Sequence, residues 1–254
     1  MAILYVASDA IELKPFAALL TGVRRLKWPI DYAFEGVWEG RRVLLAANGA
    51  GPRLASQAVE VAIRAVTAAE LSSSKLDAVI STGYCGALDP SLRECQIVVP
   101  NQLLDLETYE TFECSPVDSD AQFVSGIMVS QDRIASYAAD KEALRSHSAV
   151  AIDMEGAGIA ARAKRAGLPF YCIKVVSDRA DESFPVDINA MRNEDGRIAR
   201  VKIGVHALTH PGLVPQLLQW KRRTGNAAKA LGEFLVGCRI KPKTDTEHAA
   251  AHSE

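Results

Sequence analysis

The two stretches that decide the fold of this chain are AIDMEG at residues 151–156 and FYCIKVVSD at residues 170–178. Residues 149–154 are an apolar run with one carboxylate, which predicts a short strand. Alanine and glycine then dominate as far as Gly167, where a helix would end. Residues 170–176 predict a second, buried strand. A strand, a helix and a strand in succession predict two neighbouring parallel strands with a right-handed crossover.

Two carboxylates, Glu155 and Asp178, stand where these strands end. Carboxyl ends of parallel strands meet at one edge of a sheet, and open α/β sheets bind ligands there. Two acids that face one crevice can do acid and electrostatic work if their surroundings differ. The alternative for Glu155 is a helix cap that only stabilises the first turn.

A third acid follows the first predicted strand, residues 2–8. Asp9 can cap a helix from about residue 10 to residue 25. Glu12 would then lie at the same edge as Glu155 and Asp178. The alternative for Glu12 is a partner of the helix dipole in the first turn.

Two glycine-containing stretches follow other predicted strands: NGAGP at 48–52 and STGYCG at 81–86. The first opens a predicted helix that ends near residue 71, and its Gly-x-Gly lacks the third glycine and the acid of a dinucleotide-binding motif. In the second, glycines after a strand over 76–81 would let backbone N–H groups face a ligand. An ordinary bulge or turn is the alternative.

The length suits one large α/β domain or two small ones, and we expect a single domain over residues 1–240. The chain has 254 residues, of which 48% are hydrophobic, and a net charge of −2. It shows no basic stripe, so we expect no nucleic-acid partner. Its five cysteines lack the spacing of a metal site. Without a secretory signal, this pattern predicts a cytoplasmic protein, and the polar residues 241–254 predict a disordered tail.

Two further helices are expected, over residues 138–146 and from residue 213 onward. The first is polar and should be solvated. In the second, leucines and Trp220 recur at helical spacing and are followed by KRR at 221–223. Such a helix can rest on a membrane surface, and packing at the domain edge is the alternative.

Four stretches together resemble the superfamily of purine nucleoside phosphorylases and methylthioadenosine/S-adenosylhomocysteine nucleosidases. They are Glu12, residues 81–86, DMEGA at 153–157 and VSD at 176–178, in this order. The resemblance covers about residues 2–180 and implies a three-layer αβα sandwich with a twisted mixed central sheet. Asp195-Gly196 and the segment 211–223 resemble the branch associated with hopanoid synthesis.

The resemblance implies a role for each matched residue. Asp178 would stand beside N7 of a purine and give it a proton as the base leaves, and Ser177 would orient this acid. Glu155 and Met154 would hold the ribose. Glu12 would position or deprotonate the attacking water. The other residues implied to contact the substrate are Gly83, Tyr84, Cys85, Gly86, Asp153 and Lys174.

These roles agree with the chemistry of ribosyl transfer. Breaking the bond between ribose and base passes through an oxocarbenium-like state with positive charge on the sugar and negative charge on the base. A carboxylate beside the sugar stabilises the first charge, and an acid beside the base relieves the second.

Three departures from the family pattern bear on which nucleophile the protein uses and how it binds its substrate. Ser81 stands where phosphorylases carry an arginine, and the loop from Ser8 to Ala10 lacks their phosphate-binding sequence. Lys174 stands where the family commonly has an arginine. A lysine ammonium lacks the planar, forked hydrogen-bonding geometry of a guanidinium. No aromatic follows the predicted strand 125–130, although Tyr84 can stack on a base instead.

We therefore expect a nucleosidase without metal or cofactor that hydrolyses the N-glycosidic bond of an adenine nucleoside. Its 5'-substituent would be a methylthio group or a bulky group such as a hopane. The alternatives are a phosphate-dependent nucleoside phosphorylase and a nucleoside-binding protein without catalysis. The resemblance also implies a homodimer or larger homo-oligomer, and the 213–223 segment suits peripheral contact with a membrane.

Overall fold

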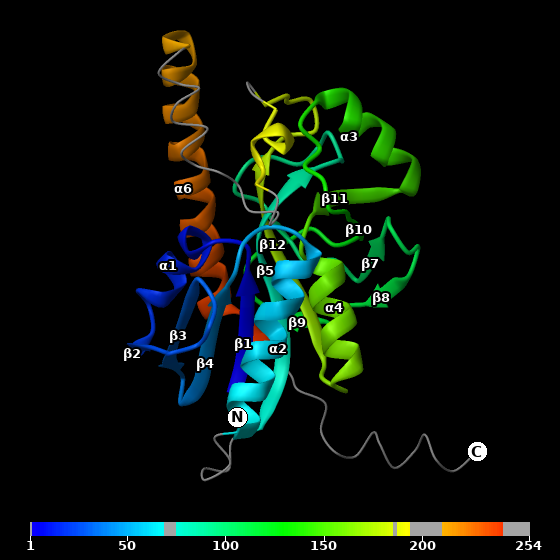
Figure 1. The fold of residues 1–254 in the computed structure, drawn as a ribbon. Coiled ribbons are helices and arrows are strands. Elements are labelled where there is room, and N and C mark those ends of the chain that lie inside the picture. The colour runs from blue at the N-terminus through cyan, green and yellow to red at the C-terminus, as the bar shows by residue number, and fades with distance from the viewer. Residues whose placement is uncertain (1, 69–74, 185–186, 194–209, 241–254) are drawn as a thin grey trace, which may run out of the picture.

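The computed structural model describes residues 2–68, 75–184, 187–193 and 210–240 (Figure 1). The predicted tail over 241–254 and the Asp195-Gly196 pair lie outside these residues.

A mixed sheet of 11 strands forms the centre of the molecule. Its strands are β1 (Ala2–Ala7), β2 (Thr21–Arg25), β3 (Tyr32–Trp38), β4 (Arg41–Ala47), β5 (Leu76–Ala87), β6 (Ile97–Val98), β7 (Gln102–Asp105), β8 (Thr111–Glu113), β10 (Ile127–Ser130), β11 (Ala149–Asp153) and β12 (Phe170–Asp178). The order is β2-β3-β4-β1-β5-β11-β10-β7-β8, and β12 pairs with both β5 and β6. A separate pair joins β9 (Val117–Asp118) to β13 (Arg239–Ile240).

Helices cover both faces of this sheet, which confirms the predicted three-layer α/β architecture (Figure 1). On one face, α2 (Pro52–Ala68) and α4 (Gly156–Arg165) pack with residues such as Ala58 and Ile159 in one core cluster. On the other face, α1 (Ala10–Ala17) and α6 (Val214–Gly237) bury Phe16 and Leu231 in a second cluster. The first half of α6 extends beyond the rest of the molecule (Figure 1).

The expected parallel neighbours β11 and β12 are not hydrogen-bonded to each other, so this prediction was wrong. Both strands pair with β5 instead: β12 runs parallel to it, whereas β11 pairs antiparallel with its last residues. The reason is that β5 is longer than predicted and continues through the stretch 81–86, where a loop was expected. Gly83 adopts a φ of +112° within this strand, a conformation that favours glycine.

The predicted helix over residues 10–25 was also too long. It ends at Ala17, and Thr21–Arg25 form the edge strand β2, antiparallel to β3. Gly22 has a φ of +60°, which a helix cannot accommodate, and Arg24 forms an ion pair with Glu35 of β3. Pairing with β3 therefore overrides the local helical pattern. The predicted hairpin of β3 and β4 and the helix that begins at Pro52 are confirmed.

Gly158→Ala should destabilise the protein, because α2 and α4 touch at this glycine. A Cβ there would lie 2.1 Å from the carbonyl oxygen of Pro52. Overpacking of this kind costs about 1–3 kcal/mol, so urea unfolding should show a lower free energy of unfolding. Gly225→Ala is the matched control, since this helical glycine has open space around it and alanine favours a helix by about 1 kcal/mol. Equal stability of the two variants would contradict the close approach of the helices.

Candidate active site

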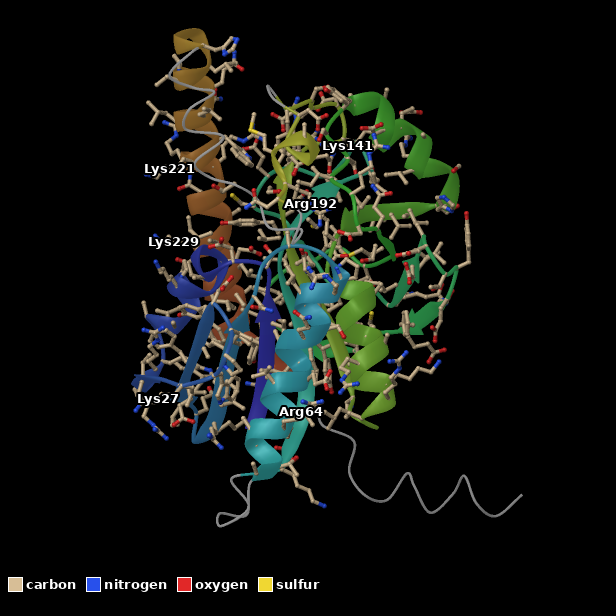
Figure 2. All side chains as sticks on the ribbon, in the orientation of Figure 1. Lys27, Arg64, Lys141, Arg192, Lys221 and Lys229 are labelled. Atoms are coloured by element: carbon tan, nitrogen blue, oxygen red, sulfur yellow. The ribbon has the colours of Figure 1, made fainter. Side chains whose placement is uncertain are left out.

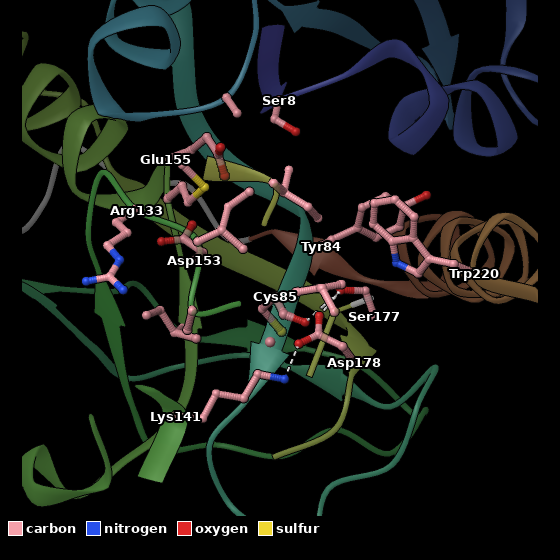
Figure 3. A pocket seen from close by; sticks show the side chains of 18 residues that line it. Ser8, Tyr84, Cys85, Arg133, Lys141, Asp153, Glu155, Ser177, Asp178 and Trp220 are labelled. Carbon is pink, nitrogen blue, oxygen red and sulfur yellow. Dashed lines mark hydrogen bonds and ion pairs between the residues drawn. The ribbon is translucent and has the colours of Figure 1, made fainter. Parts of the chain in front are cut away.

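A cavity lies where β5, β11 and β12 end, and most of the predicted site residues line it (Figure 3). These are Tyr84, Cys85, Gly86, Asp153, Met154, Glu155, Ser177 and Asp178. Glu12, Gly83 and Lys174 do not line it and lie directly behind residues that do.

Gly86 of β5 brings the two strand ends to this cavity. In the sheet it pairs with Ile152 of β11 and also with Asp178 of β12. A Cβ on Gly86 would lie 3.0 Å from Asp178 Oδ2 and 3.3 Å from Ile152 Cγ2. The absence of a side chain therefore allows both strands to approach, and the two predicted acids reach one cavity although their strands are not neighbours.

Asp178 is held by donors on both of its carboxylate oxygens. The Ser177 hydroxyl donates to Oδ1 at 2.6 Å, and the Lys141 ammonium donates to Oδ2 at 2.5 Å (Figure 3). Lys141 comes from α3 (Ala138–Leu144), which the sequence predicts to be solvated, yet its side chain is only 1% exposed. That prediction was wrong for Lys141, because α3 lies over the cavity and no local pattern marks one lysine of a polar helix as buried.

Lys174 is a second buried lysine, fully enclosed beneath the other end of the cavity. Its ammonium lies 2.8 Å from Asp153 Oδ2 and 3.9 Å from Glu155 Oε2, and it donates to the Thr82 carbonyl at 3.1 Å. Burial alone would lower the pKa of Lys174, but the two carboxylates raise it above its usual value. Lys174 is thus a counter-ion beneath the site.

Glu155 is 6% exposed and does not act as the cap of α4, since its side chain makes no cap hydrogen bond. The cap is Asp153, whose Oδ2 accepts from the Gly156 N–H at 2.9 Å. Glu155 Oε1 instead accepts from the Gly51 N–H of the NGAGP loop at 3.0 Å. Burial raises the pKa of Glu155, against the attraction of Lys174. Its carboxylate is therefore available to the cavity.

Glu12 combines the two roles that the sequence leaves open. Its Oε1 accepts from the Asp9 N–H at 3.0 Å and completes a capping box at the start of α1. It also accepts from the hydroxyl of Ser8, which lines the cavity, while Oε2 accepts from the Tyr84 N–H at 3.0 Å. Burial, with repulsion from Glu155, raises the pKa of Glu12 to about 7.

Gly83 explains how Glu12 comes so close to β5. A Cβ at this position would lie 1.9 Å from Glu12 Oε2, which no real contact allows. Only a glycine can therefore sit at this point of β5 while Glu12 bonds to the next residue of the strand.

Two aromatic residues complete the cavity wall: one that sequence reasoning did not mention, and Trp220, which it placed only on the helix from residue 213. Phe184 and Trp220 both line it, and their rings meet edge to face at a centroid distance of 5.6 Å. Trp220 comes from α6, and Tyr84 is tied to the same helix by a 2.8 Å hydrogen bond to the Thr224 carbonyl. Both residues lie outside the four matched stretches of sequence, so no pattern placed them in the site.

No group of three or more His, Cys, Asp or Glu side chains suited to a metal ion occurs in the described part of the chain. None of the helices described is both long enough and apolar enough to cross a membrane.

Comparison with known proteins gives one family match. A model of the phosphorylase superfamily matches residues 3–119 and 112–201, which is more than half of the chain.

Solved structures with the same fold include several nucleosidases. The 5'-methylthioadenosine/S-adenosylhomocysteine nucleosidase of Helicobacter pylori, in complex with an amino-pyrrolopyrimidine linked to a pyrrolidinol, has 18% identity, covers 92% of this chain and 96% of its own, and gives a TM-score of 0.65. The corresponding enzyme of S. pneumoniae, with a transition-state inhibitor, has 20% identity, coverage of 93% and 99%, and a TM-score of 0.63. Futalosine hydrolase of Helicobacter pylori has 18% identity, coverage of 92% and 95%, and a TM-score of 0.65.

Glu12→Gln should stabilise the protein more at pH 8 than at pH 5. In the unfolded chain Glu12 loses its proton near pH 4.5, whereas in the folded protein its pKa is about 7. Between these values only the unfolded state releases the proton, so stability falls as the pH rises towards 7. Glutamine imitates the protonated acid at every pH and should remove a penalty of about 1–3 kcal/mol.

Urea unfolding of both proteins at the two pH values measures this difference. The control is Glu113→Gln, at an exposed position of β8, which should not change the pH dependence. If Glu12→Gln and wild type differ by the same amount at pH 5 and pH 8, Glu12 does not titrate in this range.

Proposed function

This chain belongs to the phosphorylase superfamily, and we propose that it is an N-glycosyl hydrolase that cleaves a purine nucleoside with water as the nucleophile. The observation that carries the proposal is the convergence of Glu155, Asp178 and the Ser8–Glu12 pair on one cavity. The molecules bound to the structural neighbours, which resemble nucleosides, support a ligand of this class.

The ribose would lie against Met154 and Glu155. As the bond from C1' to the base lengthens, positive charge develops on the sugar. A carboxylate that is already fixed by the Gly51 N–H costs little reorganisation and can stabilise this charge. It can also accept hydrogen bonds from the ribose hydroxyls.

The purine would lie at the other end, near Asp178, with the aromatic rings of Phe184 and Trp220 beside it. These rings supply the apolar surface that the sequence lacks after β10. Asp178, held by Ser177 and Lys141, would face the nitrogen of the base that gains a proton as the base leaves.

The attacking water would be bound by the Ser8 hydroxyl and deprotonated with the help of Glu12 behind it. A pKa of about 7 suits Glu12 to this work, because a general base is most effective when its pKa is near the working pH.

Water is favoured over phosphate because two acids lie at the Ser8 end of the cavity, Glu155 in its wall and Glu12 behind Ser8. Glu12 and Glu155 would both repel a phosphate dianion there, and the nearby Lys174 is already paired with Asp153. Arg133 reaches the cavity, but its side chain is 63% exposed and lies 3.4 Å from Asp140. A phosphorylase therefore remains the second candidate.

Catalysis is favoured over binding alone. The two arguments for a binding protein were the lysine in place of the family arginine and the missing aromatic after β10, and the structure weakens both. Lys174, which replaces the family arginine, has a defined partner in Asp153. The missing aromatic after β10 is compensated by Phe184 and Trp220, which line the cavity from other elements.

The finer proposal concerns the 5'-substituent, which we expect to be large and apolar. Trp220 lines the cavity from α6, and its ring meets that of Phe184 edge to face. These two rings offer an apolar wall against which a large 5'-substituent would pack. Adenosylhopane or methylthioadenosine, the homo-oligomer and the peripheral membrane contact stay predictions.

Asp178→Asn should lower kcat/KM for release of adenine from methylthioadenosine by about 100- to 10,000-fold, the usual size of an acid–base contribution. Wild-type turnover should not depend on phosphate and should yield free methylthioribose. Adenine release with and without phosphate, with sugar products identified by chromatography, measures both. Asp181→Asn, at an exposed neighbour of Asp178, is the control. Turnover that requires phosphate would instead identify a phosphorylase.

A series of 5'-alkylthio adenosines should be cleaved faster as the chain lengthens. Each buried CH₂ contributes about 0.8 kcal/mol, so kcat/KM should rise by about two- to fourfold per group. The controls are substituents of equal length that carry hydroxyl groups, which should show no rise. A flat or falling alkyl series would contradict an apolar wall formed by Phe184 and Trp220.

A further inference from the structure

We propose that Lys141 is a further catalytic residue, whose ammonium gives the departing purine its proton. This inference rests on the proposed function and deepens it. The sequence assigns proton donation to Asp178, whereas the geometry of the pair points to its lysine partner.

The position of Lys141 is unusual for a lysine of a short polar helix. Figure 2 labels Lys141 together with the outlying Lys27 and Lys221. Arg64 and Lys229 also have largely exposed side chains, whereas Lys141 of α3 lines the cavity. Its side chain is 1% exposed. A lysine is almost never fully buried unless it is paired, so its burial here indicates a specific use for the charge.

The hydrogen bonds of Lys141 leave one donor for a ligand. An ammonium has three N–H groups. One donates to Asp178 Oδ2 at 2.5 Å and another to the Arg179 carbonyl at 2.6 Å. The third has no hydrogen-bond acceptor among the described residues, and Lys141 lines the cavity. The Phe184 ring, with its centroid 5.8 Å from Nζ, covers another side of the charge.

Asp178, by contrast, is engaged as an acceptor on both oxygens. One accepts from the Ser177 hydroxyl and the other from the Lys141 ammonium. Of the two groups, only the ammonium carries an N–H that no described residue accepts. The geometry therefore places the proton available to the base on nitrogen.

Lys141 and Asp178 together offer the donor and the acceptor that the N7 edge of an adenine base requires. On that edge N7 is an acceptor and the 6-amino group is a donor, side by side. Lys141 can donate to N7 while the free lone pairs of Asp178 accept from the amino group. Two adjacent groups of opposite hydrogen-bonding character would thus recognise adenine and supply the proton.

The step then balances. The bond between C1' and N9 breaks and its electron pair moves to the purine, while a proton moves from Lys141 Nζ to N7. The oxygen of water bonds to C1', and a proton of this water moves to Ser8 Oγ as the Ser8 hydroxyl proton moves to the Glu12 carboxylate. Lys141 is left as a neutral amine and Glu12 as an acid, and transfer of one proton through solvent restores both.

The experiment compares two leaving groups in two variants. Lys141→Met should lower kcat/KM for methylthioadenosine by about 100-fold or more, the usual contribution of a proton donor. With a 4-nitrophenyl riboside, whose leaving group needs no proton, the same variant should keep its rate to within about threefold. Lys164→Met is the matched control, because Lys164 also pairs with a carboxylate and lies over a phenylalanine, but on the surface.

A second variant covers the case in which Lys141→Met does not fold or the riboside is not cleaved. Lys141→Gln keeps a hydrogen-bond donor but has no proton to give, so KM for methylthioadenosine should stay within about threefold while kcat falls by about 100-fold or more. Unchanged kcat in Lys141→Gln, or equal losses on both leaving groups in Lys141→Met, would overturn the role of Lys141.

The failure of this inference can be told from failure of the proposed function. If wild-type protein releases no base from any purine nucleoside, the proposed function is wrong. If wild type releases the base and Lys141→Gln does so equally well, only the assignment of the proton to Lys141 is wrong.

Discussion

The backbone of β5 is the constraint on which the rest of the structure depends. Its Gly86 pairs with β11 on one side and with β12 on the other, so that two strands that are not neighbours end at one cavity. Three residues earlier, Gly83 lets Glu12 of α1 bond to the backbone of the same strand. One strand therefore collects three acids from distant parts of the chain, and a side chain at either glycine would push one of them away.

Two buried lysines then fix the charges around this cavity. Lys174 is paired with Asp153 at one end and Lys141 with Asp178 at the other, and both side chains are almost completely enclosed. Burying an ion pair is expensive, and removing one partner costs about 3–5 kcal/mol because the other charge stays buried. A buried pair is therefore weak evidence for stability. Here the two pairs place a lysine and its carboxylate partner at each end of the cavity.

Much of the fold could be predicted from local patterns. The apolar runs around residues 149–154 and 170–176, the helix between them and the helix that begins at Pro52 all appear in the structure. The errors share one physical cause, which is that strand pairing overrides local preference. Thr21–Arg25 pair with β3 where a helix was expected, and β5 continues through two glycines because strands on both sides bond to it.

Local patterns in the chain pointed to three acids, each placed after an expected strand, and to glycines where backbone must come close. Which side chains face the cavity and which lie behind it depends on the folded chain, because burial and ion pairing join elements that are far apart in sequence. In the structure Lys174 is the counter-ion of Asp153, and Asp153 rather than Glu155 caps α4. Lys141 and Trp220 line the cavity from α3 and α6. A lysine on a polar helix carries no local sign of its partner, so sequence reasoning could not have found it.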